Sequence, residues 1–190
     1  MSYQRSRANS GVMIALQQPN PDAWNTALLF LRIAAGGVMI AHGYNHIFRG
    51  GKIEGTARWF ASVGMKPGIL HAWLASITEL GAGALLLVGL LTPLAAAAVV
   101  SVMLVAITTV HRKNGFFIFR PGEGWEYTGF ITVTALALGT IGAGEWSLDD
   151  AFDITAFDGW TSFWVTLLVG VGSAGALLAG FYRPEKPVNT

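Results

Sequence analysis

Five blocks of apolar residues constrain this chain more than any other feature, because each block is long enough to cross a lipid bilayer. They cover about residues 27–47, 69–91, 94–110, 127–144 and 160–182. Each block has about 17–23 residues, the length that a helix rising 1.5 Å per residue needs to cross a core roughly 30 Å thick. Charged residues make up only 12% of the chain, about half the share found in soluble domains. The sequence therefore predicts an all-α, polytopic membrane bundle of about five transmembrane helices.

The segments around these blocks set the expected domain organisation. Residues 1–24 contain only a short apolar run, which is not long enough for a secretory signal peptide. We expect them to form a flexible amino-terminal arm. Residues 25–150 are expected to hold a core of four transmembrane helices. The end of an acidic loop and a fifth transmembrane helix follow at residues 151–183, and residues 184–190 form a short tail.

The Lys and Arg residues fall mainly on one side of the predicted bundle. An alternating path of five helices puts nine of the 12 on the same face: Arg49, Lys52, Arg58, Lys66, Arg112, Lys113, Arg120, Arg183 and Lys186. Only Arg5 and Arg7 fall on the other face. Because cytoplasmic loops are enriched in Lys and Arg, we expect an external amino terminus and a cytoplasmic carboxyl terminus in a bacterial-type plasma membrane.

The charge pattern also limits the expected partners. The formal net charge is +1, and no basic stretch is interleaved with aromatic residues, so no nucleic-acid partner is predicted. The expected partners are the lipid bilayer and other membrane protein subunits.

Small residues recur four positions apart in two of the predicted helices. Gly37 and Ala41 lie in the first block, and Gly172, Ala176 and Gly180 lie in the last. Small residues at this spacing let helix backbones approach closely in lipid. We therefore predict helix packing at these five positions, with the row in the last block packing on this protein or on a partner.

Two ionisable residues lie inside the predicted spans, Arg32 in the first and Glu79 in the second. Such residues cost about 2.5–3.5 kcal/mol on insertion scales, so they are functional candidates by default. Arg32 is only about five residues, roughly 7.5 Å, inside its block. The alternative to a functional role is therefore that its long side chain snorkels to the outer headgroups. Glu79 lies near mid-membrane, where the sequence leaves two states open: a pair with a cation or a protonated carboxyl group.

Histidines near the ends of the predicted helices extend this polar set. His42, His46, His71 and His111 lie toward the predicted cytoplasmic side, together with Glu126. Such groups bind a quinone head, relay protons, or hold haem or a metal ion. The alternative is that these residues have no site function and lie at the membrane–water interface. Since His46 is expected at the headgroups, no metal site is predicted. A hydrogen bond between His42 and Glu79 is feasible at their depths. The resulting candidate polar site comprises Arg32, His42, Glu79, His111 and Glu126.

Four ordered blocks of sequence suggest a family. The runs LRIAAGGVMIAHG, TELGAGALLLVGLLTPLAAAA, HRKNGFFIF with GWEY, and GAGEWSLDD together resemble the DoxX family and cover about residues 31–150. The resemblance implies a compact four-helix membrane bundle, so the fifth helix at residues 160–182 is an addition to it. It also implies a link to thiosulfate:quinone oxidation or to oxidant-handling complexes. The matching polar positions are Arg32, Glu79, His111 and Glu126.

Three functions remain open at this stage. The first is a DoxX-like membrane subunit of a redox complex, with a quinone or a bound lipid as its ligand. The alternative is a non-catalytic accessory or scaffolding subunit that docks through the fifth helix. The third is a small-molecule or proton pathway through the bundle. The chain has no Cys and no GxGxxG fingerprint, so no intrinsic cofactor is expected, and any redox activity requires partner subunits.

Overall fold

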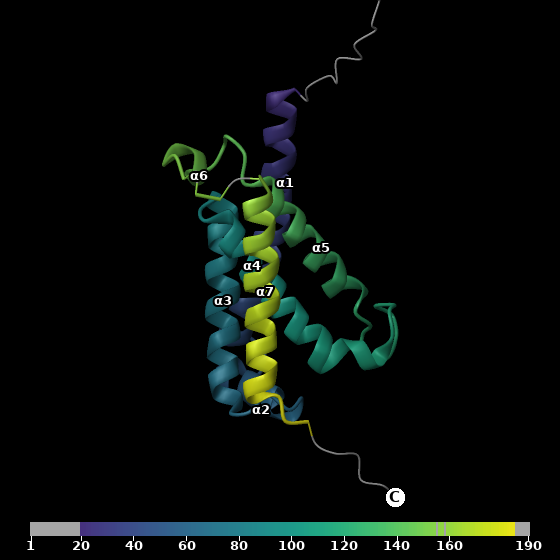
Figure 1. The fold of residues 1–190 in the computed structure, drawn as a ribbon. Helices are drawn as coiled ribbons and strands as arrows, with labels where there is room; N and C mark the ends of the chain where they lie inside the picture. The colour runs from purple at the N-terminus through teal and green to yellow at the C-terminus, as the bar shows by residue number, and fades with distance from the viewer. Residues whose placement is uncertain (1–19, 155, 158, 185–190) are drawn as a thin grey trace, which may run out of the picture.

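The computed structural model describes residues 20–154, 156–157 and 159–184. Residues 1–19, which include most of the predicted amino-terminal arm, lie outside the described residues, as do residues 185–190 of the predicted tail. The described part consists of helices joined by short loops (Figure 1). The helices are α1 (Pro21–Phe48), α2 (Lys52–Ser62), α3 (Gly68–Val88), α4 (Thr92–Ala106), η1 (Ile107–His111), η2 (Arg112–Asn114), α5 (Glu126–Ile141), α6 (Leu148–Ala151) and α7 (Gly159–Phe181).

The prediction of an all-α membrane helix bundle is confirmed. Four helical segments of the described chain are long and apolar enough to span a membrane: Pro21–Phe48, Gly68–Val88, Thr92–Asn114 and Gly159–Phe181. The remaining expected span, residues 127–144, corresponds to α5, which has 16 residues. At 1.5 Å per residue it is about 24 Å long, shorter than a hydrocarbon core of about 30 Å. The beginning of α1 and the end of α7 lie at opposite ends of the bundle (Figure 1).

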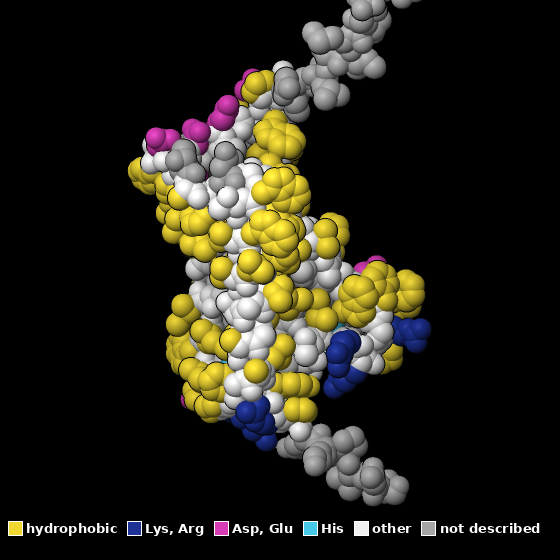
Figure 2. Space-filling view, viewed as in Figure 1, with side chains coloured by type: hydrophobic (Ala, Val, Ile, Leu, Met, Phe, Trp, Pro, Cys, Tyr) yellow, Lys and Arg dark blue, Asp and Glu magenta, His cyan; other side chains and the backbone are white. Residues whose placement is uncertain are grey.

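The surface of the molecule is that of an integral membrane protein. Large apolar side chains cover its flank, with Phe30 66% exposed, Ile77 63% exposed and Leu168 63% exposed. Dark blue Lys and Arg side chains gather toward the end of the bundle that holds α2, whereas magenta carboxylates gather at the end that holds α6 (Figure 2). An apolar flank between two charged ends is the arrangement that a bilayer requires, since apolar side chains face the acyl chains.

α1 and α3 pack closely because two glycines face each other. A Cβ atom on Gly36 would lie 2.6 Å from the Gly83 carbonyl oxygen, and one on Gly83 would lie 2.7 Å from the Gly36 carbonyl oxygen. The predicted packing pair, Gly37 and Ala41, is instead exposed, and a Cβ atom on Gly37 would meet nothing within 4 Å. This prediction was wrong by one position, which rotates the packing face by about 100° around the helix.

α7 also packs through small residues, but not through those predicted. Its buried stripe faces α4 and α5 and consists of Ser162, Thr166, Gly170 and Ala174. The hydroxyl of Thr166 donates a hydrogen bond to the carbonyl of Pro93 at 3.1 Å. The predicted row is exposed on the outer face of α7: Gly172, Ala176 and Gly180. Packing of this row within the described chain was therefore a wrong prediction, and its packing on a partner stays a prediction.

The loop between α5 and α7 closes one end of the bundle. The carboxylate of Asp149 accepts hydrogen bonds from the backbone N–H groups of Leu91 and Thr92 at 2.6 and 3.0 Å, and from the Thr92 hydroxyl at 2.7 Å. Asn25 donates to the carboxylate of Glu145 at 2.8 Å and accepts from its backbone N–H at 2.9 Å. These contacts tie the loop to the beginnings of α1 and α4.

The opposite half of α4 leaves the bundle. Its backbone passes through the π-helical segment η1 and the short 3₁₀ segment η2, and the chain then turns back into α5 through residues 115–125. The end of this helix, the loop and the start of α5 project sideways from the other helices (Figure 1). We call this projecting unit, residues 107–130, the arm. Its departure leaves a space between the arm and α1.

Candidate functional site

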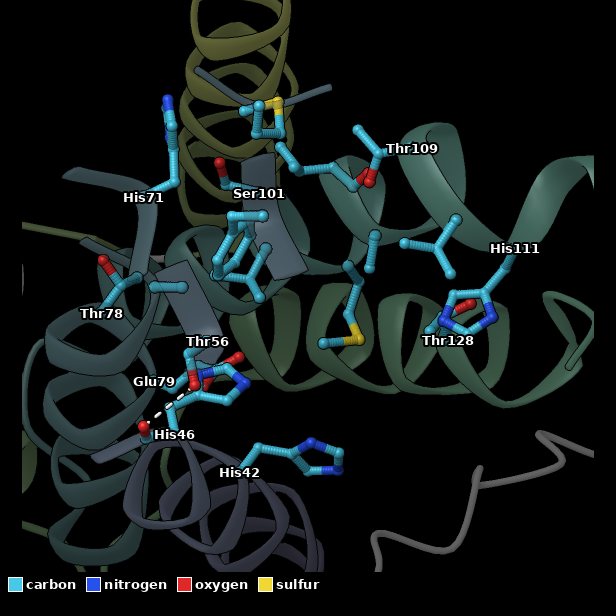
Figure 3. Close-up of a pocket in the computed structure, with 18 of the residues that line it drawn as sticks. His42, His46, Thr56, His71, Thr78, Glu79, Ser101, Thr109, His111 and Thr128 are labelled. Carbon is cyan, nitrogen blue, oxygen red and sulfur yellow. Dashed lines mark hydrogen bonds and ion pairs between the residues drawn. The ribbon is translucent and has the colours of Figure 1, made fainter. Parts of the chain in front are cut away.

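A cavity of about 1270 Å³ fills the space between the arm and the bundle. Its walls come from all six of the longer helices and are mainly apolar, with residues such as Val102, Ile131 and Leu177. Polar side chains enter it at several points, and Figure 3 labels His42, His46, Thr56, His71, Thr78, Glu79, Ser101, Thr109, His111 and Thr128. The cavity combines a large apolar volume with localised hydrogen-bonding groups, as small-molecule sites generally do.

The ion pair of this cavity joins Glu79 on α3 to His46 on α1. Nδ1 of His46 lies 3.1 Å from Oε2 of Glu79, and the side chains are 18% and 6% exposed respectively. The two atoms are within ion-pair distance, but their geometry does not make a hydrogen bond. The attraction is therefore electrostatic when His46 is protonated. Both atoms keep hydrogen-bonding capacity that a ligand can use.

The partner of Glu79 differs from the one that the sequence suggested. His42 lines the same cavity, but no bond between His42 and Glu79 is present, and the ion pair is made by His46 one turn later. α1 continues to Phe48, so His46 is still part of the helix. Thr56 of α2 fixes this turn, since its hydroxyl donates to the His46 carbonyl at 3.0 Å.

His71 is a second buried polar group in the cavity wall. It is only 3% exposed, and its Nε2 atom makes no hydrogen bond within the described structure. Its ring packs between Phe181, at a centroid distance of 5.0 Å, and Phe60, at 6.2 Å. Most buried polar atoms in proteins have a partner. The Nε2 atom of His71 is therefore available to a polar ligand of this cavity.

The arm brings His111 to the cavity but not Glu126. His111 ends the π-helical segment, lines the cavity, and has its Nδ1 atom 3.0 Å from the Glu123 carbonyl oxygen. The carboxylate of Glu126 accepts a hydrogen bond from the backbone N–H of Ile118 at 3.0 Å. Glu126 is absent from the wall of the cavity. Its contact stabilises the loop of the arm, and the structure does not place it with the other candidate residues.

Arg32 lies far from this site. It is 14 residues before His46 on the same helix, which corresponds to about 21 Å along the axis. Its side chain is 1% exposed and donates a hydrogen bond from Nη2 to the Trp146 carbonyl at 2.7 Å. The nearby carboxylate of Asp149 attracts it electrostatically. Arg32 does not snorkel to the headgroups, and it belongs to the closed end of the bundle.

Three of the five candidate polar residues thus share one cavity: His42, Glu79 and His111. Sequence reasoning named His46 and His71 without including them in the site. It missed Ser101, Thr109 and Thr128 altogether, because hydroxyl residues are common in membrane helices and carry no distinctive spacing. In the described residues, no group of three or more His, Asp or Glu side chains is placed to hold a metal ion.

A comparison with protein families gives one match. The family model DoxX matches residues 27–112, which extend from α1 to the first residue of η2. The match includes Glu79, His46 and His111 but ends before α5 and α7. No curated protein and no solved structure matches the chain.

Proposed function

We propose that this chain, which belongs to the DoxX family through residues 27–112, is the membrane subunit of a redox complex and receives the head of a quinone in its interior cavity. The observation that carries the proposal is the Glu79–His46 pair, held at 3.1 Å in the wall of a cavity of about 1270 Å³. A pair of titratable groups beside an apolar volume suits a molecule with a polar, proton-accepting head and an apolar tail.

The chemistry of a quinone supports this assignment. Its ring oxygens accept hydrogen bonds, and its reduction consumes two protons together with two electrons. Imidazole N–H groups and protonated carboxyl groups donate such bonds, and both kinds of side chain transfer protons. The cavity offers His46, His111 and Glu79 for this role. Because the chain contains no cysteine, it has no thiolate with which to hold an iron–sulfur cluster. We therefore assign the electron carrier to a partner subunit.

A quinone titration tests the proposal. Trp59 lines the cavity, so a short-chain benzoquinone bound there should quench its fluorescence in the detergent-purified protein, and W59F should lose that response. We expect E79Q to weaken binding about tenfold, which corresponds to about 1.4 kcal/mol, because a neutral amide attracts the His46 side chain, the proposed donor to the quinone, less strongly than a carboxylate does. E54Q is the matched control, since Glu54 is exposed on α2. Quenching that does not saturate, or equal affinities in E79Q and E54Q, would contradict a quinone site.

We also propose that the amino terminus faces outward and that the carboxyl terminus is cytoplasmic, in a plasma membrane of bacterial type. The segregation of Lys and Arg toward the end that holds α2 supports this orientation (Figure 2). A fluorescent or phosphatase reporter fused after Thr190 reports the side directly. A carboxyl terminus found outside would reverse the orientation.

A second candidate function is an accessory subunit that docks through α7. The observation in its favour is the exposed row Gly172, Ala176 and Gly180, since a Cβ atom on either glycine would meet nothing within 4 Å. Such a row lets a helix of another subunit approach closely. Copurification of G172L with its native complex tests this function, and undiminished copurification would exclude docking at this face.

A further inference from the structure

The outer side of the arm carries a groove that is separate from the interior cavity. It has a volume of about 520 Å³ and lies between the beginning of η1, the loop of the arm and the first turns of α5. Its walls include Ile107, Phe116, Trp125 and Val133, none of which lines the interior cavity. Phe130 and Val133, on the same wall, are 71% and 66% exposed. The groove therefore opens on the apolar flank of the molecule, where acyl chains lie.

Three cations belong to the same projecting arm as this groove. Arg112, Lys113 and Arg120 are exposed, and none of them makes a salt bridge within the described residues. Dark blue and yellow side chains gather together on the projecting arm (Figure 2). Two carboxylates are nearby. Glu123 lines the interior cavity, and Glu126 lines the groove, where its carboxylate accepts a hydrogen bond from the backbone N–H of Ile118. The arm thus carries more positive than negative charge beside an apolar groove.

The loop of the arm is held in one conformation. Asn114 donates its side-chain amide to the carbonyls of Gly122 and Glu123. Backbone hydrogen bonds run from Trp125 to the Gly115 carbonyl at 3.1 Å and from Gly124 to the Phe117 carbonyl at 3.1 Å. A site held in this way loses little entropy when a ligand binds.

From this juxtaposition we infer that the arm binds one anionic phospholipid, with an acyl chain in the groove and the phosphate at Arg112, Lys113 and Arg120. The first two cations lie at the end of the candidate spanning segment Thr92–Asn114, five and six residues after Ile107 in the groove wall. Cationic side chains at the bilayer surface attract anionic lipids, and the aromatic residues of the loop suit the interface.

Native mass spectrometry of the detergent-purified protein tests this site with phosphatidylglycerol and phosphatidylcholine of identical acyl chains. The wild type should retain phosphatidylglycerol in preference to phosphatidylcholine. R112Q/K113Q should lower the affinity for phosphatidylglycerol about 30-fold, the equivalent of about 2 kcal/mol for two surface cations. The matched control is K52Q/R58Q, which removes the same charge from α2, where both residues are exposed, and should leave the affinity unchanged.

A second pair of variants tests the groove without altering charge. V133W fills the groove and should reduce retention of phosphatidylglycerol at least tenfold. I77W adds the same ring on α3, where Ile77 is 63% exposed, and should have no effect. Equal retention of the two lipids by the wild type, or equal losses in a variant and its control, would overturn the inference. The quinone titration uses neither lipid nor these residues, so the two proposals fail independently.

Discussion

Replacing Asp149 by Ala removes three hydrogen bonds at once from the beginning of α4. The carboxylate accepts from the backbone N–H groups of Leu91 and Thr92 and from the Thr92 hydroxyl, at 2.6 to 3.0 Å. Thr92 is 0% exposed, so water cannot replace the lost acceptor without a rearrangement of the loop. Buried Arg32 also loses the carboxylate that attracts it.

The size of the effect follows from these contacts. A hydrogen bond to a charged group contributes about 1.5–3 kcal/mol, and the loss of a helix-capping side chain typically costs about 1 kcal/mol. The three bonds share one carboxylate and are not additive, so we expect D149A to lower the free energy of unfolding by about 3 kcal/mol. For a chain of this length, that loss corresponds to a fall in Tm of about 6–12 °C.

Thermal unfolding of the detergent-purified protein, followed by tryptophan fluorescence, measures this difference. D150A is the matched control, because Asp150 is exposed and its hydrogen bonds are made by its backbone: the N–H donates to the Ser147 hydroxyl, and the carbonyl accepts from the N–H of Asp153. D150A should melt within about 2 °C of the wild type, which corresponds to the small effect of a surface substitution. Equal Tm values for D149A and D150A would show that the loop does not hold the end of the bundle.

Two further predictions concern helix packing and use the same melting assay. G83V should lower Tm by about 6 °C or more, because its side chain would collide with the backbone of Gly36, and overpacking of this kind costs about 1–3 kcal/mol. G81V is the control: a Cβ atom at Gly81 meets nothing within 4 Å, so this variant should keep the Tm of the wild type. G170L should likewise destabilise the protein, because its Cβ atom would lie 2.8 Å from a methyl group of Val100, whereas G172L should melt as the wild type does. A G172L protein less stable than G170L would reverse our assignment of the buried face of α7.

The class of fold was predictable because the bilayer imposes a simple length rule. Blocks of about 20 apolar residues predict spanning helices, and four such helices are present in the described structure. The rule fails for α5, since apolar residues continue past the end of the helix at Ile141. Hydropathy reports where apolar residues lie, whereas the end of a helix depends on backbone geometry, and Gly142 ends α5 at a φ of 88°.

The packing faces were not predictable from spacing alone. α1 contains two adjacent glycines, and Gly37 has a small residue four positions later whereas Gly36 does not. The structure nevertheless buries Gly36, because Gly83 on α3 faces it. Spacing along one helix describes a surface that is suitable for contact, but the identity of the neighbour decides which surface is used. A pair of complementary glycines on two helices is a property that neither segment shows by itself.

The polar residues show the same limit in a form that bears on function. Arg32 and Glu79 were both predicted as site residues because each puts an ionisable side chain inside a predicted span. Both side chains are buried, at 1% and 5% exposure. Their depths place them in different halves of the bundle, so Arg32 meets the carbonyl of Trp146 at one end, and Glu79 meets His46 near the other. The sequence identified the charges that need compensation. The antiparallel path of α1 and α3 then decides the partner, which is an imidazole for Glu79 and a backbone carbonyl for Arg32. Imidazole and carboxyl groups transfer protons, whereas a backbone carbonyl does not, so the cavity wall around Glu79 is the place to look for chemistry.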